Sequence, residues 1–348
     1  MFVGHAAIAL AVAGGIALLR GLPRNRALAV ACLAGLFATL PDVDMLFALS
    51  GFLRAESVGP FALAAGFWRA SVPVHRSITH AIPVAIGVAV GASLMTGEGG
   101  RVSPSGLGLG RTRFSRRVLH RAPSRLHQTP SRIPRVPLVA GAGVLTATLL
   151  AIRVAGSRID LLVGVVFVAG AVLLARGASQ WGIDRKWILG SALLGLVSHP
   201  FGDLLTGRPP RLLFPLDLTV LDARVVLSTD PTMHLLGAFF VEVAAIWLGI
   251  GVLASLAMVD LREYLEPHAL FGVGYGLLVA VFPPPTLETS YHFVFSVLAM
   301  GGLGIIPGRA RLPHLPTAVV TGFAAVTLAG LAYTVGYLLV GGLVPVVP

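Results

Sequence analysis

Four short motifs in this chain carry side chains that commonly bind metal ions. They supply four histidines and three aspartates: His5 in GHAAIAL, Asp42 and Asp44 in LPDVDML, His75 and His80 in HRSITH, and His199 and Asp203 in HPFGD. The only cysteine, Cys32, lies in an apolar run, so any metal must be held by histidine and carboxylate ligands. Seven such groups suffice for one or two ions. The mixed nitrogen and oxygen set favours zinc, with manganese or iron as alternatives.

The spacing within two of the motifs predicts how each pair of side chains is used. His199 and Asp203 are four residues apart, which places them on one face of a helix and suits two ligands of one metal. Pro200 either disfavours helix at His199 or opens a new helical turn there. On a regular helix Asp42 and Asp44 would point to nearly opposite faces. We therefore expect one of these aspartates to bind metal and the other to orient a ligand or act as a base, and the sequence does not say which.

The HRSITH motif predicts a loop followed by a helix. His75 and His80 are five residues apart, so a continuous helix would turn their rings away from each other, whereas a loop can bring them together. Pro83 suits the first turn of a helix, and a helix that begins there leaves His80 just outside it. Taken singly, each of the four motifs is also explained by a turn or by a polar residue at the membrane boundary.

The composition is that of an integral membrane protein. Of the 348 residues 55% are hydrophobic and 12% are charged, and the mean hydropathy is +0.86, which excludes a water-soluble globular protein. The apolar runs are too long and continuous for the alternating strands of a membrane barrel, so they predict helices. We predict an all-α, polytopic helical bundle with eight to ten spans, from the candidate segments 2–19, 27–49, 81–96, 137–155, 159–176, 187–205, 233–259, 268–283, 291–306 and 316–343.

The chain is predicted to divide into four regions. Residues 1–96 hold the first spans and three of the motifs, and residues 137–215 hold the spans that complete the metal site. Between them, residues 97–136 contain nine arginines among many Gly, Ser and Pro, which predicts a flexible loop attracted to anionic lipid; a nucleic-acid contact is the less favoured interpretation. Residues 216–348 hold further spans without an assigned role.

The distribution of basic residues predicts the orientation of the spans. With ten spans, 18 of the 26 basic residues fall on the side that carries residues 97–136, and eight fall on the other side. Cytoplasmic segments carry the excess of Lys and Arg, so we expect both termini to be extracytoplasmic. All four motifs then lie at the extracytoplasmic face. Ionisable groups near the membrane are costly and tend to be functional, so their convergence favours a metal centre.

The order of the motifs resembles that of a known family. GHAAIAL, LPDVD, HRSITH and HPFGD, followed by TGRPPRLLFPL, look like the pattern of the YdjM-like family over roughly residues 1–215, with the arginine-rich segment as an insertion. Members of that family are described as membrane-bound, metal-dependent hydrolases, so the resemblance implies metal binding by all seven motif residues. The order is more distantly similar to the zinc-dependent phospholipase C and P1 nuclease group, in which several zinc ions cleave phosphoesters.

These expectations combine into a metal-dependent hydrolase of the cell membrane that acts on a small-molecule or lipid phosphoester through a metal-activated water. Arg76 and Arg208 are expected to receive the phosphate, although arginines at a membrane boundary also extend into water without a ligand. Membrane lipids are expected partners and nucleic acid is not. His234, Glu288 and His292 lie on the same side and are expected to be boundary residues.

Two other classes of function stay open. A transporter or channel would use the same groups to bind protons or a cation, but it predicts charged residues near the middle of spans and paired broken helices. In this chain the acidic residues of the motifs lie at the ends of spans. A structural membrane protein would use the metal only to tie helices together, with a closed coordination shell.

Overall fold

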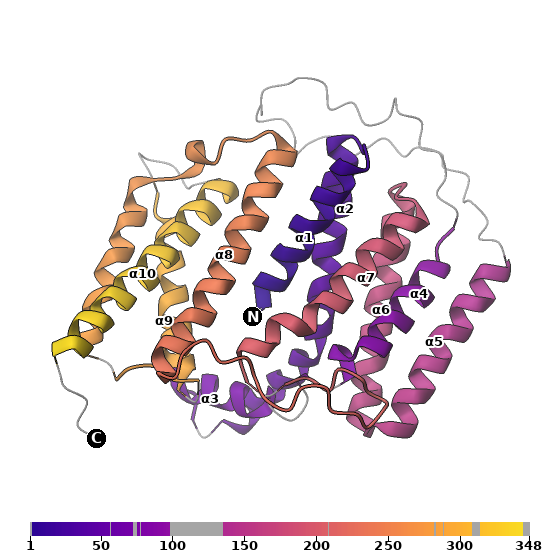
Figure 1. Ribbon diagram of the computed structural model, residues 1–348, viewed down its shortest axis with the longest axis horizontal. Helices are drawn as coiled ribbons and strands as arrows, with labels where there is room; N and C mark the ends of the chain where they lie inside the picture. Colours follow the sequence, from indigo (N-terminus) through magenta and orange to yellow (C-terminus); the bar gives the residue numbers. More distant parts are fainter. Residues whose placement is uncertain are drawn as a thin grey trace.

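The helices of the protein run side by side in a single bundle (Figure 1). The structure is a computed structural model, and it describes residues 2–55, 57–71, 75–76, 78–97, 135–207, 209–281, 283–287, 289–307 and 314–343. Among these residues no strand occurs, which confirms the predicted all-helical class. The predicted flexible loop falls almost wholly outside the described residues, as do Arg208 and Glu288.

The first part of the chain forms the helices that surround the four motifs. The α-helices are α1 (Phe2–Leu19), α2 (Arg24–Thr39), α3 (Pro60–Ser71), α4 (Ile82–Leu94), α5 (Arg135–Ala155), α6 (Arg158–Gln180) and α7 (Arg185–Gly202). Three 3-10 helices extend or join them, namely η1 (Leu40–Arg54), η2 (Ile78–His80) and η4 (Asp203–Leu205). Because η1 follows α2 and η4 follows α7 directly, two of the motifs lie where an α-helix changes into a 3-10 helix.

The remaining part of the chain adds a second group of helices. These are α8 (Pro231–Ala257), η5 (Leu261–Tyr264), η6 (Pro267–Ala280), α9 (Ser290–Ala299), η7 (Met300–Ile305) and α10 (Leu315–Leu343). Their buried aromatic and aliphatic side chains form a cluster of their own, which includes Tyr275, Phe293 and Tyr333. Helix α8 also packs against α1, where a Cβ atom at Gly249 would lie 2.8 Å from the Cβ of Ala7. This close approach joins the second group of helices to the first.

Helices long and apolar enough to cross a membrane confirm the polytopic prediction. Six described helical segments meet both requirements, and four shorter apolar helices accompany them. These segments coincide with the ten candidate spans of the sequence. Many large apolar side chains on the outer surfaces of the helices are exposed, for example Leu150 of α5 and Leu173 of α6, as expected where lipid replaces water.

Local signals in the sequence set several helix ends. At the start of α6, Asp160 N donates to Ser157 Oγ (3.1 Å) and Ser157 N donates to Asp160 Oδ2 (2.8 Å), which is a reciprocal cap. At the start of α8, Met233 N donates to the side chain of Asp230 (2.8 Å). Helix α4 begins at Ile82 with a proline in its first turn, so the prediction that His80 lies just outside this helix is confirmed.

One end of the bundle gathers the segments next to the motifs. Helix α3, the connection between α5 and α6, and the chain that leads from α7 to α8 lie at this end, at the bottom of Figure 1. The turn between α1 and α2 lies at the opposite end. This arrangement places the segments as the alternation of ten spans predicts.

Candidate metal centre

Six of the seven predicted ligands meet in one buried cluster. The structure contains three overlapping groups that could each hold a metal ion: His5, Asp42 and His199; Asp42, His75 and His80; and His80, His199 and Asp203. Within each group, the potential ligand atoms lie within 4.8 Å of one another. The four imidazole rings form a continuous row, with centroids 4.1 Å apart for His5 and His199, 4.6 Å for His199 and His80, and 5.1 Å for His80 and His75.

His5 reaches the cluster because α1 and α7 approach each other closely. Its ring lies over Gly202, where a Cβ atom would come within 2.2 Å of the ring. Only glycine leaves room for the histidine at this point of α7. His5 is 4% exposed, and neither ring nitrogen has a hydrogen-bond partner among the described residues. Oδ1 of Asp203 lies 3.8 Å from Nε2 of His5, which is too far for a hydrogen bond. A buried imidazole without a hydrogen bond is costly, and a metal ion would satisfy it.

The two aspartates of LPDVDML have different surroundings. They lie in η1, and since a 3-10 helix has about three residues per turn, they point in different directions. Asp42 is 14% exposed, and its Oδ1 lies 3.5 Å from Nε2 of His199. Asp44 is 1% exposed and accepts a hydrogen bond from the hydroxyl of Thr79 (3.0 Å), while its Oδ1 lies 3.1 Å from Nδ1 of His75. Asp42 therefore faces Nε2 of His199 in the row of imidazoles. Asp44 instead contacts Thr79 and the Nδ1 atom of His75.

Helix α7 brings the last pair of motif residues to the cluster. It continues through Pro200 to Gly202, and Asp203 follows in a helical conformation, so the helix does not break at His199. His199 is fully buried, and its Nδ1 lies 2.7 Å from the carbonyl oxygen of Ala38. A carbonyl can only accept a hydrogen bond, so Nδ1 carries the proton and Nε2 presents a lone pair to the cluster.

The ring of His80 is oriented by a chain of hydrogen bonds. Its Nδ1 lies 2.9 Å from the hydroxyl of Thr79, which donates to Asp44. The oxygen of this hydroxyl then accepts from Nδ1, and the Nε2 atom of His80 is left with a lone pair. Burial lowers the pKa of His80, which favours the neutral ring that a metal ligand requires.

Three acceptor atoms converge as a result. Nε2 of His80 lies 3.0 Å from Nε2 of His199 and 3.1 Å from Oδ2 of Asp203. Ligands around a tetrahedral zinc ion are about 3.3–3.4 Å apart, given zinc–nitrogen distances of about 2.0–2.1 Å. The observed separations are close to this value. The donor set and its spacing therefore fit a divalent metal such as zinc.

Asp203 is held by the arginine of HRSITH. Nε of Arg76 lies 3.2 Å from Oδ2 of Asp203, and Nη2 donates to Oδ1 (3.3 Å) and to the hydroxyl of Thr206 (2.9 Å). Arg76 adopts a left-handed backbone conformation with φ of 68°, which turns its side chain toward the end of α7. The expectation that Arg76 receives a phosphate stays a prediction, and in the structure its guanidinium orients a carboxylate.

Comparison with known proteins concerns the first third of the chain. Residues 1–119 match the family model described as YdjM inner membrane protein. The resemblance inferred from the motifs is thus confirmed over these residues, which include His5, both aspartates of LPDVDML and both histidines of HRSITH. His199 and Asp203 lie beyond the YdjM match, and the structure nevertheless places them in the same cluster. No curated protein and no solved structure matches the chain significantly.

Several residues that shape the centre were not singled out from the sequence. Thr79 links Asp44 to His80, the carbonyl of Ala38 orients His199, and Gly202 admits His5. A threonine next to a histidine, as in the ITH of HRSITH, was the only local signal for the first of them. His234 lies outside the three groups; it is buried, and its Nδ1 accepts a hydrogen bond from the backbone of Leu227 (3.1 Å).

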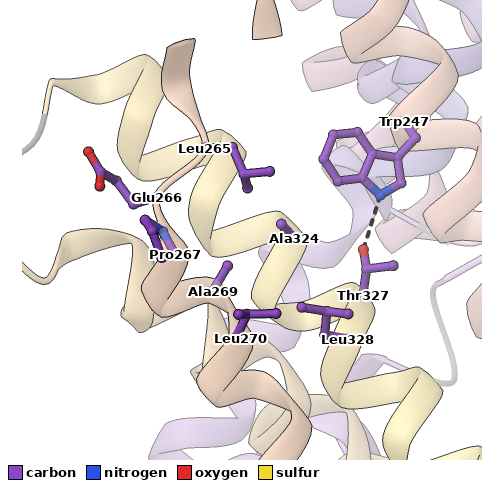
Figure 2. A pocket seen from close by; sticks show the side chains of 9 residues that line it. All are labelled: Trp247, Leu265, Glu266, Pro267, Ala269, Leu270, Ala324, Thr327 and Leu328. Carbon is purple, nitrogen blue, oxygen red and sulfur yellow. Dashed lines mark hydrogen bonds between the residues drawn. The ribbon is translucent and has the colours of Figure 1, made fainter. Parts of the chain in front are cut away.

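A cavity elsewhere in the protein does not involve the motifs. It has a volume of about 470 Å³ and lies between α8, the η5–η6 segment and α10 (Figure 2). Its lining is almost entirely apolar, and the indole N–H of Trp247 donates to the hydroxyl of Thr327 (3.0 Å) at one edge. The side chain of Glu266 points away from the other lining residues. The cavity lacks the polar groups that chemistry would require.

Proposed function

We propose that the protein is a membrane-embedded, metal-dependent hydrolase and that its substrate is a phosphoester. The observation that carries the proposal is a buried group of three potential ligand atoms. Nε2 of His80 lies 3.0 Å from Nε2 of His199 and 3.1 Å from Oδ2 of Asp203. With both Nδ1 atoms protonated, these three atoms carry lone pairs and repel one another unless a proton or a metal cation lies between them, and a divalent metal can satisfy all three at once. The resemblance to the YdjM-like family supports the same class of activity.

The members of the cluster differ in exposure, and this difference suggests where the reaction takes place. Asp42 and His75 are 14% and 15% exposed, whereas His80, His199 and Asp203 are at most 1% exposed. Substrate would therefore approach from the side of Asp42 and His75. A divalent ion held by the cluster would supply Lewis acidity and lower the pKa of a water molecule. The carboxylate of Asp42, the most exposed acidic group of the cluster, would accept the proton from that water.

Other residues would keep the ligands in place. Asp44 orients His75 through the contact with Nδ1, and Arg76 holds both oxygens of Asp203. Such supporting contacts fix ring orientation and raise the basicity of the ligands. We assign the base to Asp42 and the orienting role to Asp44, a choice that the sequence left open. Zinc suits the set of nitrogen and oxygen ligands, with manganese or iron as alternatives. We place the centre at the extracytoplasmic face, on the distribution of basic residues.

Metal analysis of purified protein tests the proposal. We expect the wild type to retain a stoichiometric divalent metal, and His80→Ala and Asp203→Ala to lose it. His314→Ala is the matched control, since His314 is exposed and belongs to none of the three groups. Thermal unfolding would show that each variant is folded. A metal-free wild type would contradict the metal centre.

A hydrolysis screen then tests the activity. Water-soluble phosphomonoesters and phosphodiesters, and phospholipids in vesicles, would be offered to the metal-loaded protein. We expect turnover of at least one class that is lost in Asp42→Asn while metal is retained. Bound metal without any turnover would contradict the hydrolase and favour a metal that only ties the helices together.

A further inference from the structure

The chain between α7 and α8 exposes an unusual amount of apolar surface. Within residues 216–227, here called the apolar loop, six large aliphatic side chains are between 44% and 61% exposed: Leu216, Leu218, Val220, Val225, Val226 and Leu227. This segment is not helical, and it lies at the end of the bundle rather than along its sides. Contiguous apolar patches that face water are rare, so this surface is expected to be covered.

Hydrogen bonds fix the apolar loop beside the metal centre. Val225 N donates to the carbonyl of Leu204, the residue that follows Asp203 (2.8 Å). Leu227 N donates to His234 at the start of α8 (3.1 Å). Just before the loop, Ile82 N at the start of α4 donates to the carbonyl of Leu212 (2.8 Å). The loop is therefore held next to the segment that carries Asp203.

A second apolar surface lies at the same end. Helix η1, which carries Asp42 and Asp44, exposes the side chains of Leu49, Phe52 and Leu53. Val58, which precedes α3, and Trp68 of α3 are exposed as well. Leu53 and Val58 are more than 90% exposed. In Figure 1, α3 lies at the same end of the bundle as the apolar loop. Aliphatic residues beside a tryptophan and basic residues are typical of a segment at the boundary of a bilayer.

The bilayer is the occupant that these surfaces fit. Both are joined in the chain to helices long and apolar enough to cross a membrane, since η1 prolongs α2 and the apolar loop leads from α7 to α8. Exposed charged residues of both signs accompany them, namely Arg54, Arg211, Arg224, Asp217 and Asp222, as expected for segments at the level of the lipid headgroups and not in the hydrocarbon core. We infer that the apolar loop and the η1–α3 segment lie within the lipid interface around the metal centre, and that the substrate is a lipid phosphoester that enters from the bilayer. The second half of this inference depends on the proposed hydrolase.

The position of the apolar loop can be measured without any assay of activity. In a Cys32→Ser background, Leu218→Cys and Val226→Cys would carry an environment-sensitive fluorophore in vesicles that contain brominated lipids. Leu150→Cys on the outer surface of α5 is the reference within the bilayer, and Gln180→Cys at the exposed end of α6 is the reference in water. We expect quenching at positions 218 and 226 to approach that at position 150. Quenching no greater than at position 180 would overturn the inference, as would cross-links showing that a second copy covers the loop.

Substitutions in the apolar loop also test the substrate class. We expect the double variant Leu218→Ser/Val226→Ser to turn over a phospholipid in vesicles roughly tenfold more slowly, because the loop would bury less apolar surface in the lipid interface. Turnover of a water-soluble ester with the same headgroup should be unchanged. Equal effects on both substrates would overturn the lipid assignment. Absence of turnover with any substrate would contradict the hydrolase and with it the lipid substrate, whereas the quenching result alone decides where the loop lies.

Discussion

Which ring nitrogen of a histidine is free to bind a metal ion depends on the hydrogen-bond partner of its other nitrogen. Nδ1 of His199 donates a hydrogen bond to the carbonyl of Ala38, and Nδ1 of His80 donates to the hydroxyl oxygen of Thr79. The Nε2 atom of each ring therefore faces the cluster with a lone pair. The sequence could predict the seven histidines and aspartates from type and spacing. It could not predict these partners, since Ala38 and His199 are 161 positions apart and meet only when α2 packs against α7.

Substitution of Gly202 tests how tightly His5 is seated. A Cβ atom at this position would lie 2.2 Å from the ring of His5, so Gly202→Ala should displace the histidine. We expect metal affinity to fall by roughly 10 to 100-fold, as for the loss of other groups that support a ligand. Isothermal titration with zinc after chelation would measure this change. Gly190→Ala in the same helix is the control, because no atom lies within 4 Å of its Cβ position. Equal affinities of the two variants would show that His5 does not bind the metal.

At the scale of elements, the membrane helices follow from composition, but the helix ends that carry LPDVDML and HPFGD follow from packing. The ten apolar runs predicted the membrane helices well, because lipid requires every backbone group to be paired within the helix. The 3-10 geometry of η1 and the passage of α7 through Pro200 were not predictable. Propensity disfavours helix at His199, and contacts of α7 with α1, α2 and α4 outweigh it.

Helix α8 tests whether the second group of helices supports the centre. The backbone N–H groups of Val3 and Gly4 donate to Oε1 of Glu242 (3.3 and 3.4 Å), so α8 caps the first turn of α1 just before His5. We expect Glu242→Ala to weaken metal binding severalfold by loosening that turn. Glu242→Gln keeps an acceptor oxygen and should bind metal nearly as well as the wild type. Zinc titration of both variants would measure the difference, and unchanged affinity in Glu242→Ala would remove α8 from this role.

The whole molecule has a predicted orientation that can be tested by labelling. Ala155 and Gln180 are exposed residues just before and at the end of α6, so they lie at opposite ends of one span. In a Cys32→Ser background, we expect a membrane-impermeant thiol reagent to label Ala155→Cys in intact cells. Gln180→Cys should be labelled only after the membrane is opened, because the basic residues place this end in the cytoplasm. The reverse pattern would move the metal centre to the cytoplasmic face.

The separation of the ligands along the chain also governs when the centre can assemble. His5 belongs to α1, whereas Asp203 follows the last turn of α7 and is made many residues later. A nascent chain that ends before Asp203 lacks one of the three atoms that converge on the centre, and His199 arrives only four residues earlier. A metal ion held by all three atoms could therefore bind only after α7 has been made. Such binding also requires that α7 has packed against α1, α2 and α4.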